Sequence, residues 1–213
     1  MKKEIYSYNS ESLTCNDRPI LPIMGEFHFS RYPEGEWKTA IKNMQQGGVD
    51  IVATYVFWIH HEEAEGEWDF SGRRNLKAFL SCCQEAGMKV WLRIGPWAHG
   101  ECRNGGFPDW LVEKEKRGNL SLRTDDPQYL KYVDLFFTKI AEQADGYMHK
   151  DDGPVIGIQI ENEYGHAGGP SDREEGMAHM RTLRAMAEKN GLTAPYFSAV
   201  SYTHLTLPTN SLV

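Results

Sequence analysis

The sequence has no long apolar stretch. No run of about 18 apolar residues occurs in the 213-residue chain, so no segment is typical of a transmembrane helix. The first residues, Met1 to Ser7, carry positive charge but are not followed by the apolar core of a secretory signal. We therefore predict a soluble, cytoplasmic protein with no membrane partner, and a secreted or periplasmic location stays an alternative.

Cysteine is also scarce, and basic residues are outnumbered by acidic ones. The four cysteines stand at positions 15, 82, 83 and 102 without a CxxC pair, which indicates neither a zinc knuckle nor a disulfide framework. The net charge is −7, which disfavours a nucleic-acid partner. The glycine-rich loop at residues 95–106 contains neither GxGxxG nor GK[ST], the usual phosphate-binding patterns.

Apolar stretches typical of strands alternate with stretches of helical spacing. Strands are expected at residues 20–29, 50–57, 89–94, within 153–165 and at 195–199, and helices at 33–46, 76–86, 108–116, 128–147 and 174–189. This alternation, with no hairpin signal, predicts right-handed βαβ units and a parallel sheet. The residues before position 19 are expected to form an edge element.

Unusual polar residues follow each of the first four expected strands, all at the same end of the sheet. This favours a (β/α)8 TIM barrel over a doubly wound sheet, whose site lies at one switch point. The 213 residues are fewer than the ~250 of a complete barrel. We therefore expect an α/β fold that is a TIM barrel truncated after about strand 5.

The most informative stretch is GPVIGIQIENEYG, residues 153–165. It is a buried strand that ends in Glu161, Asn162 and Glu163. Ionised carboxylates are seldom buried without a partner, so this polar tip indicates chemistry at the carboxyl end of the strand. A surface acidic cluster after a core strand is the alternative. The stretch resembles the signature of glycoside hydrolase family 35, the β-galactosidase family, whose barrel strand 4 ends in Asn-Glu.

Three further segments carry the same resemblance. They are ATYVFW at residues 53–58, GPWAHGE at 95–101 and FPDWL at 107–111. Together with the strand-4 signature, the matches run in the family's order from Pro19 to Ala199. An ordered set of matches is more specific than any one of them.

The resemblance implies roles for four residues. Glu163 falls on the family's catalytic acid/base, and Asn162 on the amide that binds the sugar 2-hydroxyl. Tyr55 and Glu101 fall on residues that contact galactose, with a core tyrosine and a loop salt bridge to Arg103 as the alternatives. Glu161 is better interpreted as a structural carboxylate that braces its neighbours. No metal or cofactor is implied.

The implied activity is that of a retaining glycosidase that releases terminal β-D-galactose from a β-galactoside oligosaccharide or glycoconjugate. The family's nucleophile is a Glu at the end of strand 7, which this chain does not reach, so we expect it to be inactive alone. Glu26, Phe57 and the pair His99-Gly100 depart from the family pattern. The glycone, the linkage and the oligomeric state are therefore not predicted.

Two other functions fit parts of the sequence. A metal-dependent barrel hydrolase would use His28, His60, His61 and His99, although neither HxH on the first strand nor HExxH is present. A non-catalytic galactoside-binding relative would lack the strand-7 Glu.

The last residues differ in character from the rest. The segment VSYTHLTLPT, from Val200, resembles a translated sequencing adapter. We therefore expect residues 1–199 to be the N-terminal part of a glycoside hydrolase barrel and residues 200–213 to be a non-native tail. An ordinary loop after strand 5 is the alternative.

Overall fold

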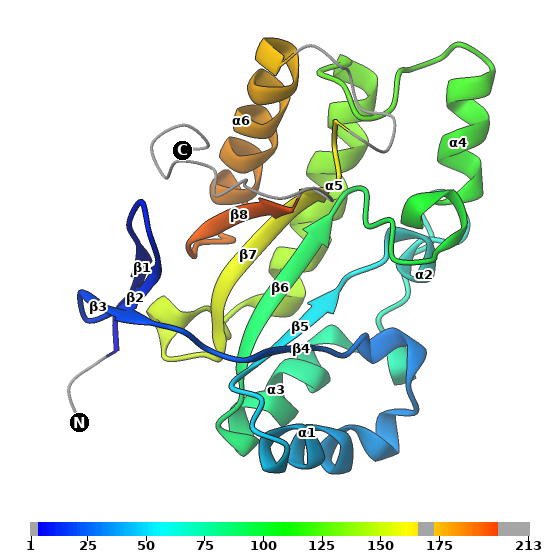
Figure 1. Ribbon diagram of the computed structural model, residues 1–213. Coiled ribbons are helices and arrows are strands. Elements are labelled where there is room, and N and C mark those ends of the chain that lie inside the picture. The colour runs from blue at the N-terminus through cyan, green and yellow to red at the C-terminus, as the bar shows by residue number, and fades with distance from the viewer. Residues whose placement is uncertain (1–3, 166–172, 200–213) are drawn as a thin grey trace.

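The computed structural model of the chain describes residues 4–165 and 173–199. Two sheets lie in this part of the chain (Figure 1). A small antiparallel sheet contains β1 (Tyr6–Tyr8), β2 (Leu13–Cys15) and β3 (Arg18–Ile20). A larger parallel sheet contains β4 (Met24–Glu26), β5 (Ile51–Tyr55), β6 (Lys89–Gly95), β7 (Val155–Asn162) and β8 (Tyr196–Ala199).

Helices connect the strands of the parallel sheet. The α-helices are α1 (Trp37–Gln46), α2 (Trp58–His61), α3 (Leu76–Ala86), α4 (Asp109–Lys116), α5 (Pro127–Ala144) and α6 (Arg173–Lys189). Short 3-10 helices are η1 (Phe29–Arg31), η2 (Glu34–Glu36), η3 (Gly72–Arg74), η4 (Arg103–Gly106) and η5 (His149–Asp151). None of the helices in the described ranges is long and apolar enough to span a membrane.

The larger sheet is the first part of a (β/α) barrel. Its strands lie side by side in chain order, β4-β5-β6-β7-β8, and every neighbouring pair is parallel. A doubly wound sheet would reverse this order at its switch point. The helices α1, α3, α5 and α6 pack against one another in the same sequence (Figure 1). The expected truncated barrel is confirmed.

The helix boundaries follow from local sequence signals. In α3 the Asn75 side chain accepts a hydrogen bond from the backbone N–H of Ala78, and Gly87 ends the helix with a left-handed φ of 70°. The buried stripe of this helix is the expected one, Leu76, Phe79, Leu80 and Cys83. In α5 the Asp126 carboxylate caps the N–H groups of Gln128 and Tyr129, and Pro127 opens the first turn.

The inner surface of the barrel is built in rows, because strand register aligns side chains across the sheet. One row contains Ala53, Trp91 and Gly157. A Cβ atom added to Gly157 would lie 2.4 Å from Cε3 of Trp91, so the indole occupies the space that a side chain would need. Glycine at position 157 is therefore a packing requirement of the Trp91 ring.

The next row towards the carboxyl ends of the strands is polar. It contains Tyr55, Arg93 and Gln159, aligned on neighbouring strands. Tyr55 and Gln159 are buried, and Arg93 is partly buried. The inner surface thus changes from apolar to polar between adjacent rows.

The N-terminal residues form hairpins, which the sequence analysis did not predict. A two-residue turn, Asn16-Asp17, joins β2 to β3 with φ values of 52° and 63°. Asn and Asp tolerate this left-handed conformation better than most residues, so the pair is a hairpin signal. Tyr6 and Leu13 from this small sheet pack on the apolar cluster of Ile51, Ala53, Trp91 and Ile156.

The first strand of the barrel is also shorter than expected. β4 contains only three residues of the expected 20–29 stretch, and Leu21 before it is 98% exposed.

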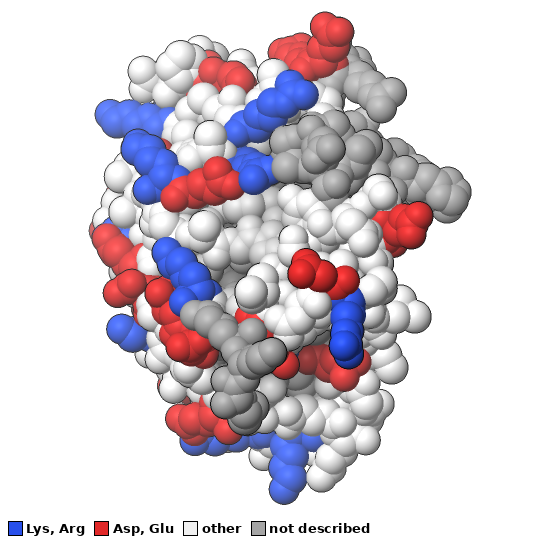
Figure 2. Space-filling model, turned by 90° about the vertical axis from the view of Figure 1, so that its left-hand side faces the viewer, with Lys and Arg blue, Asp and Glu red and all other residues white. Residues whose placement is uncertain are grey.

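Charged side chains of both signs are interspersed on the face shown in Figure 2. The expected boundary at residue 200 and the non-native tail lie outside the described residues and stay predictions.

Candidate active site

The end of β7 has an unusual backbone. Glu161 and Glu163, on either side of Asn162, have φ values of 54° and 49°. Two left-handed residues break the regular alternation of side chains along a strand. As a result the Glu161 side chain is fully buried, whereas the Glu163 side chain is 26% exposed. The two carboxylates therefore have different environments, although they are two positions apart.

Glu161 is paired inside the protein. Its Oε1 and Oε2 atoms accept hydrogen bonds from Nε and Nη2 of Arg123, at 3.1 and 2.5 Å. Burial raises the pKa of the Glu161 carboxyl, and the Arg123 guanidinium opposes that effect. The geometry agrees with the structural interpretation of Glu161, and the carboxylate braces the neighbouring Asn162 N–H at 3.1 Å.

Asn162 and Tyr55 are linked through Gln159. The Gln159 Nε2 atom lies 3.2 Å from Oδ1 of Asn162, 3.4 Å from the Tyr55 hydroxyl and 2.9 Å from the carbonyl oxygen of Glu161. Nε of Arg93 donates to Oε1 of Gln159 at 2.9 Å. One buried amide therefore connects two of the predicted sugar-binding residues.

The Tyr55 ring lies between cationic and aromatic groups. The Arg93 guanidinium carbon is 3.7 Å from the centre of the Tyr55 ring, and the His28 ring centre is 5.4 Å from it. Burial raises the pKa of the Tyr55 phenol, and the carboxylates of Glu163, Glu161 and Glu101 raise it further. The phenol is thus protonated at neutral pH and can donate a hydrogen bond to a ligand.

Arg93 also contacts Glu26, one of the departures from the family pattern. Nη1 of Arg93 forms an ion pair with the Glu26 carboxylate. Burial lowers the pKa of Arg93 to about 10, so the guanidinium is still cationic at neutral pH. The second oxygen of Glu26 lies 3.7 Å from Nε2 of His28. Glu26 therefore has two partners, Arg93 and His28, at the carboxyl end of the strands.

Glu163 is the accessible carboxylate of the β7 tip. Its Oε2 atom lies 3.7 Å from Nδ1 of His99, which belongs to the loop after β6. His99 and Glu101 in this loop also have positive φ values, 60° and 48°. Glu101 is exposed, and Arg103 pairs with Asp109 at 2.8 Å. The salt bridge between Glu101 and Arg103, considered as an alternative, is therefore not formed.

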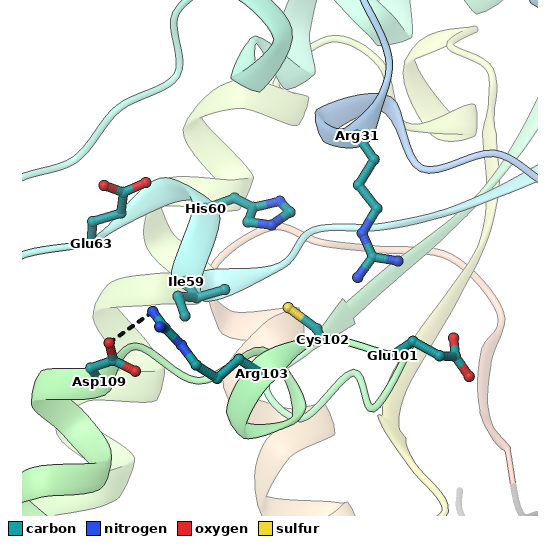
Figure 3. A pocket seen from close by; sticks show the side chains of 8 residues that line it. All are labelled: Arg31, Ile59, His60, Glu63, Glu101, Cys102, Arg103 and Asp109. Carbon is teal, nitrogen blue, oxygen red and sulfur yellow. Dashed lines mark ion pairs between the residues drawn. The ribbon is translucent and has the colours of Figure 1, made fainter.

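A pocket of about 530 Å³ adjoins this loop (Figure 3). It is lined by Arg31, Ile59, His60, Glu63, Glu101, Cys102, Arg103 and Asp109. Figure 3 shows Arg31 and Glu101 on the same side of the pocket, with His60 facing Arg31. Glu101 is the single one of the four predicted site residues in its wall, and neither Asn162 nor Glu163 lines it.

The histidines of the metal-dependent alternative have separate partners. Nδ1 of His60 lies 2.8 Å from the Ser30 hydroxyl, while His61 stacks on Phe70 with ring centres 4.6 Å apart. In the described ranges, no three His, Cys, Asp or Glu side chains form a group that could hold a metal ion. The four histidines thus do not converge.

The structure gathers the four predicted residues at one end of the sheet, and it adds three that the sequence analysis missed. Arg93 and Gln159 stand inside otherwise apolar strands, and a polar residue in a buried strand is a usable signal. Arg123 lies in a loop before α5 and has no local signal. The roles of Tyr55, Glu101, Asn162 and Glu163 stay predictions.

An unfinished parallel barrel with carboxylates beyond the carboxyl ends of its strands has the architecture of a barrel glycoside hydrolase. The family model of glycosyl hydrolases family 35 matches residues 12–208. The chain belongs to this family.

Relatives in the family support the assignment. A β-galactosidase of Homo sapiens is 37% identical over 158 residues, which cover 74% of this chain and 23% of the human protein. A β-galactosidase of Xanthomonas manihotis is 35% identical over 174 residues, which cover 82% of this chain and 28% of that protein. The chain thus spans about a quarter of the length of these relatives.

Solved structures support the fold. An exo-β-1,4-mannosidase, Op5Man5 from Opitutaceae bacterium strain TAV5, superimposes with a TM-score of 0.64 at 18% identity, over 84% of this chain and 32% of that one. A GH5_18 protein from Streptomyces cattleya gives a TM-score of 0.61 at 13% identity, over 84% of this chain and 44% of that one. At these identities the likeness extends to the fold alone.

Proposed function

We propose that residues 1–199 are the N-terminal part of the catalytic barrel of a retaining β-galactosidase, which releases terminal β-D-galactose from β-galactosides. The observation that carries the proposal is the different environment of the two carboxylates at the end of β7. Glu161 is neutralised by Arg123, whereas Glu163 is accessible beside Asn162. A glycosidase needs such an accessible carboxyl group to protonate the leaving oxygen.

In the proposed mechanism, Glu163 is the acid/base. It donates a proton to the glycosidic oxygen as the bond to the sugar breaks, and then removes a proton from the water that attacks the glycosyl-enzyme intermediate. Asn162 binds the 2-hydroxyl of the galactose, a contact that strengthens in the transition state. Tyr55 and Glu101 bind other hydroxyls, since a phenol donates and a carboxylate accepts hydrogen bonds.

The second carboxylate of the proposed mechanism comes from outside this chain. A retaining glycosidase holds its nucleophile about 5–5.5 Å from the acid/base. The family resemblance assigns the nucleophile to a Glu at the end of barrel strand 7. We therefore propose that the chain alone does not turn over a galactoside, and that it works in the cytoplasm as part of a longer protein without a nucleic-acid partner.

The test is hydrolysis by the full-length gene product and by the 213-residue chain, each purified. The full-length protein is expected to cleave 4-nitrophenyl β-D-galactoside faster than the β-glucoside, β-mannoside or α-galactoside. NMR of the first product should detect β-galactose, which marks retention. Turnover by the chain alone would contradict the proposal that the nucleophile lies outside it. Galactose binding without turnover in the full-length protein would favour a non-catalytic relative.

A further inference from the structure

Arg123 is a buried charge that contacts several residues of the site. Its residue surface is 3% exposed, and its guanidinium forms the two hydrogen bonds with Glu161 described above. Nη2 also donates to the backbone carbonyl oxygen of Asn162 at 3.1 Å. Arg123 therefore contacts both residues that precede Glu163.

The residue after Glu163 is joined to the same arginine. The Tyr164 hydroxyl donates to the Arg123 carbonyl oxygen at 2.7 Å, and the guanidinium carbon lies 5.1 Å from the centre of the Tyr164 ring. On another side, the Trp97 ring centre is 4.6 Å from that carbon. Arg123 thus touches the β7 tip before and after Glu163, as well as the loop that follows β6.

Tyr164 also packs against a histidine that is itself paired with an aspartate. The Tyr164 ring stacks on His179 of α6, with ring centres 5.4 Å apart. Nδ1 of His179 lies 2.7 Å from Oδ1 of Asp125, two residues after Arg123. The second oxygen of Asp125 accepts from the Thr182 hydroxyl at 2.9 Å. Helix α6 therefore anchors the loop that carries Arg123.

The β7 tip needs such an anchor for two reasons. Glu161 and Glu163 have left-handed backbone angles, and a non-glycine residue keeps such a conformation where its surroundings over-determine it. In addition, a fully buried carboxylate is strongly unfavourable unless it is paired. Arg123 meets both needs, because one planar guanidinium pairs with the Glu161 carboxylate and also binds the Asn162 carbonyl oxygen.

We propose that Arg123 is the positioning residue of this site: it fixes the backbone of Glu161 and Asn162, and thereby the direction in which the Glu163 carboxylate points. The proposal deepens the proposed function and rests on it for the identity of the acid/base. Lysine is a poor substitute, because its single ammonium group lacks the planar fork that pairs bidentately and stacks between rings. The shape of the side chain matters here as much as its charge.

The test compares three single variants of the full-length gene product, and the double variant of Arg123→Lys with Glu161→Gln, with the wild type. Arg123→Lys keeps the charge, Glu161→Gln keeps the size of the partner, and Arg74→Lys is the matched control. Arg74 is also paired with two carboxylates, those of Asp69 and Glu63, each at 2.5 Å, and it lies outside the site. Activity is measured as kcat and KM on 4-nitrophenyl β-D-galactoside, and each variant is also crystallised.

Arg123→Lys is expected to lower kcat roughly a hundredfold, the size of loss that a displacement of about 1 Å produces. KM should change less than kcat, because the Asn162 contact strengthens in the transition state. Glu161→Gln should give a loss of the same order, and the double variant should be no worse than the more damaged single variant, since the two residues act as one unit. Arg74→Lys should stay within about twofold of wild type.

The crystal structures separate this proposal from the proposed function. A shifted Glu163 carboxylate in Arg123→Lys supports positioning even if the wild-type protein cleaves no galactoside, in which case the proposed function alone fails. An unchanged backbone from Glu161 to Tyr164 in that variant overturns the positioning role, and so does a kcat within twofold of wild type. If Arg123→Lys does not fold, the same two criteria are applied to Glu161→Gln.

Discussion

The side-chain nitrogen of Gln159 lies 3.2 Å from the side-chain oxygen of Asn162, and both residues are buried. This contact fixes the orientation of the Asn162 amide, because the oxygen is occupied by Gln159. The amide nitrogen is then the group that remains to donate towards a sugar hydroxyl. Gln159 thus determines which end of Asn162 a substrate meets.

We expect Gln159→Leu to damage stability and activity together. The substitution leaves the Arg93 Nε and the Asn162 Oδ1 without their partner, and an unsatisfied buried polar group costs about 1–3 kcal/mol. Urea denaturation of the full-length protein measures the stability, and kcat/KM on a galactoside should fall more than tenfold by analogy with other misplaced contacts. Gln84→Leu, at an exposed position, is the control and should be close to neutral.

Glu163→Gln is expected to lower kcat on 4-nitrophenyl β-D-galactoside by about 10²–10⁴-fold, the usual contribution of a general acid/base. A substrate with a more acidic leaving group, 2,4-dinitrophenol, should lose less in the glycosylation step, because it needs less protonation. Glu142→Gln, in a surface pair with Lys139, should have no effect. Unchanged galactoside cleavage in Glu163→Gln would contradict the assignment.

Gly157→Ala should destabilise the barrel by about 1–3 kcal/mol, the cost typical of overpacking. The reason is the 2.4 Å separation between a Cβ at this position and the Trp91 indole. Gly35→Ala serves as the control, since a Cβ there meets nothing within 4 Å. Equal midpoints for the two variants in urea denaturation would show that the Trp91 ring moves aside without cost.

The buried His61 predicts a loss of stability in acid. Burial lowers the pKa of its imidazole to about 4, while an unfolded histidine titrates near 6.5. As the pH falls from about 6.5 towards 4, the unfolded state therefore binds a proton at His61 that the folded state does not bind. The free energy of unfolding falls through that pH window. One such group accounts for about 3 kcal/mol at most.

His61→Phe removes this titration and keeps a ring against Phe29 and Phe70. Urea denaturation at a series of pH values should give a flatter profile for the variant between about pH 6.5 and 4. The difference at pH 7.5 reports the packing change and the loss of the hydrogen bond between His61 Nδ1 and the Asp69 carbonyl oxygen, because His61 is neutral there in both states. Parallel profiles for the variant and the wild type would assign the acid sensitivity to other groups.

The helices of the barrel could be predicted because each has a local signal. The buried stripe of α3 and its Gly87 terminus are examples, and α6 begins within one residue of its expected start. The hairpin at Asn16-Asp17 was missed because its signal is two residues long and lies in a polar segment. The short β4 was overestimated because Leu21 is apolar but exposed, so apolar character alone did not indicate burial.

At the site, residue identity was easier to predict than residue partnership. The Asn162-Glu163 pair follows from the family resemblance, but the pairing of Glu161 with Arg123 joins positions 38 residues apart. Such a pair depends on how the loop before α5 folds over the β7 tip, which no local pattern records. The left-handed backbone at Glu161 and Glu163 could not be predicted either, because regular strand alternation would turn both carboxylates to the same side.

The two inner rows of the barrel have a practical consequence for engineering. Ala53, Trp91 and Gly157 stand one row below Tyr55, Arg93 and Gln159, which is a step of about 7 Å along the strands. A library randomised row by row should divide into two phenotypes, poor expression from the lower row and poor turnover from the upper one. The border between these phenotypes would fall between Trp91 and Arg93. Specificity can then be redesigned in the upper row while the packing of the lower row is left unchanged.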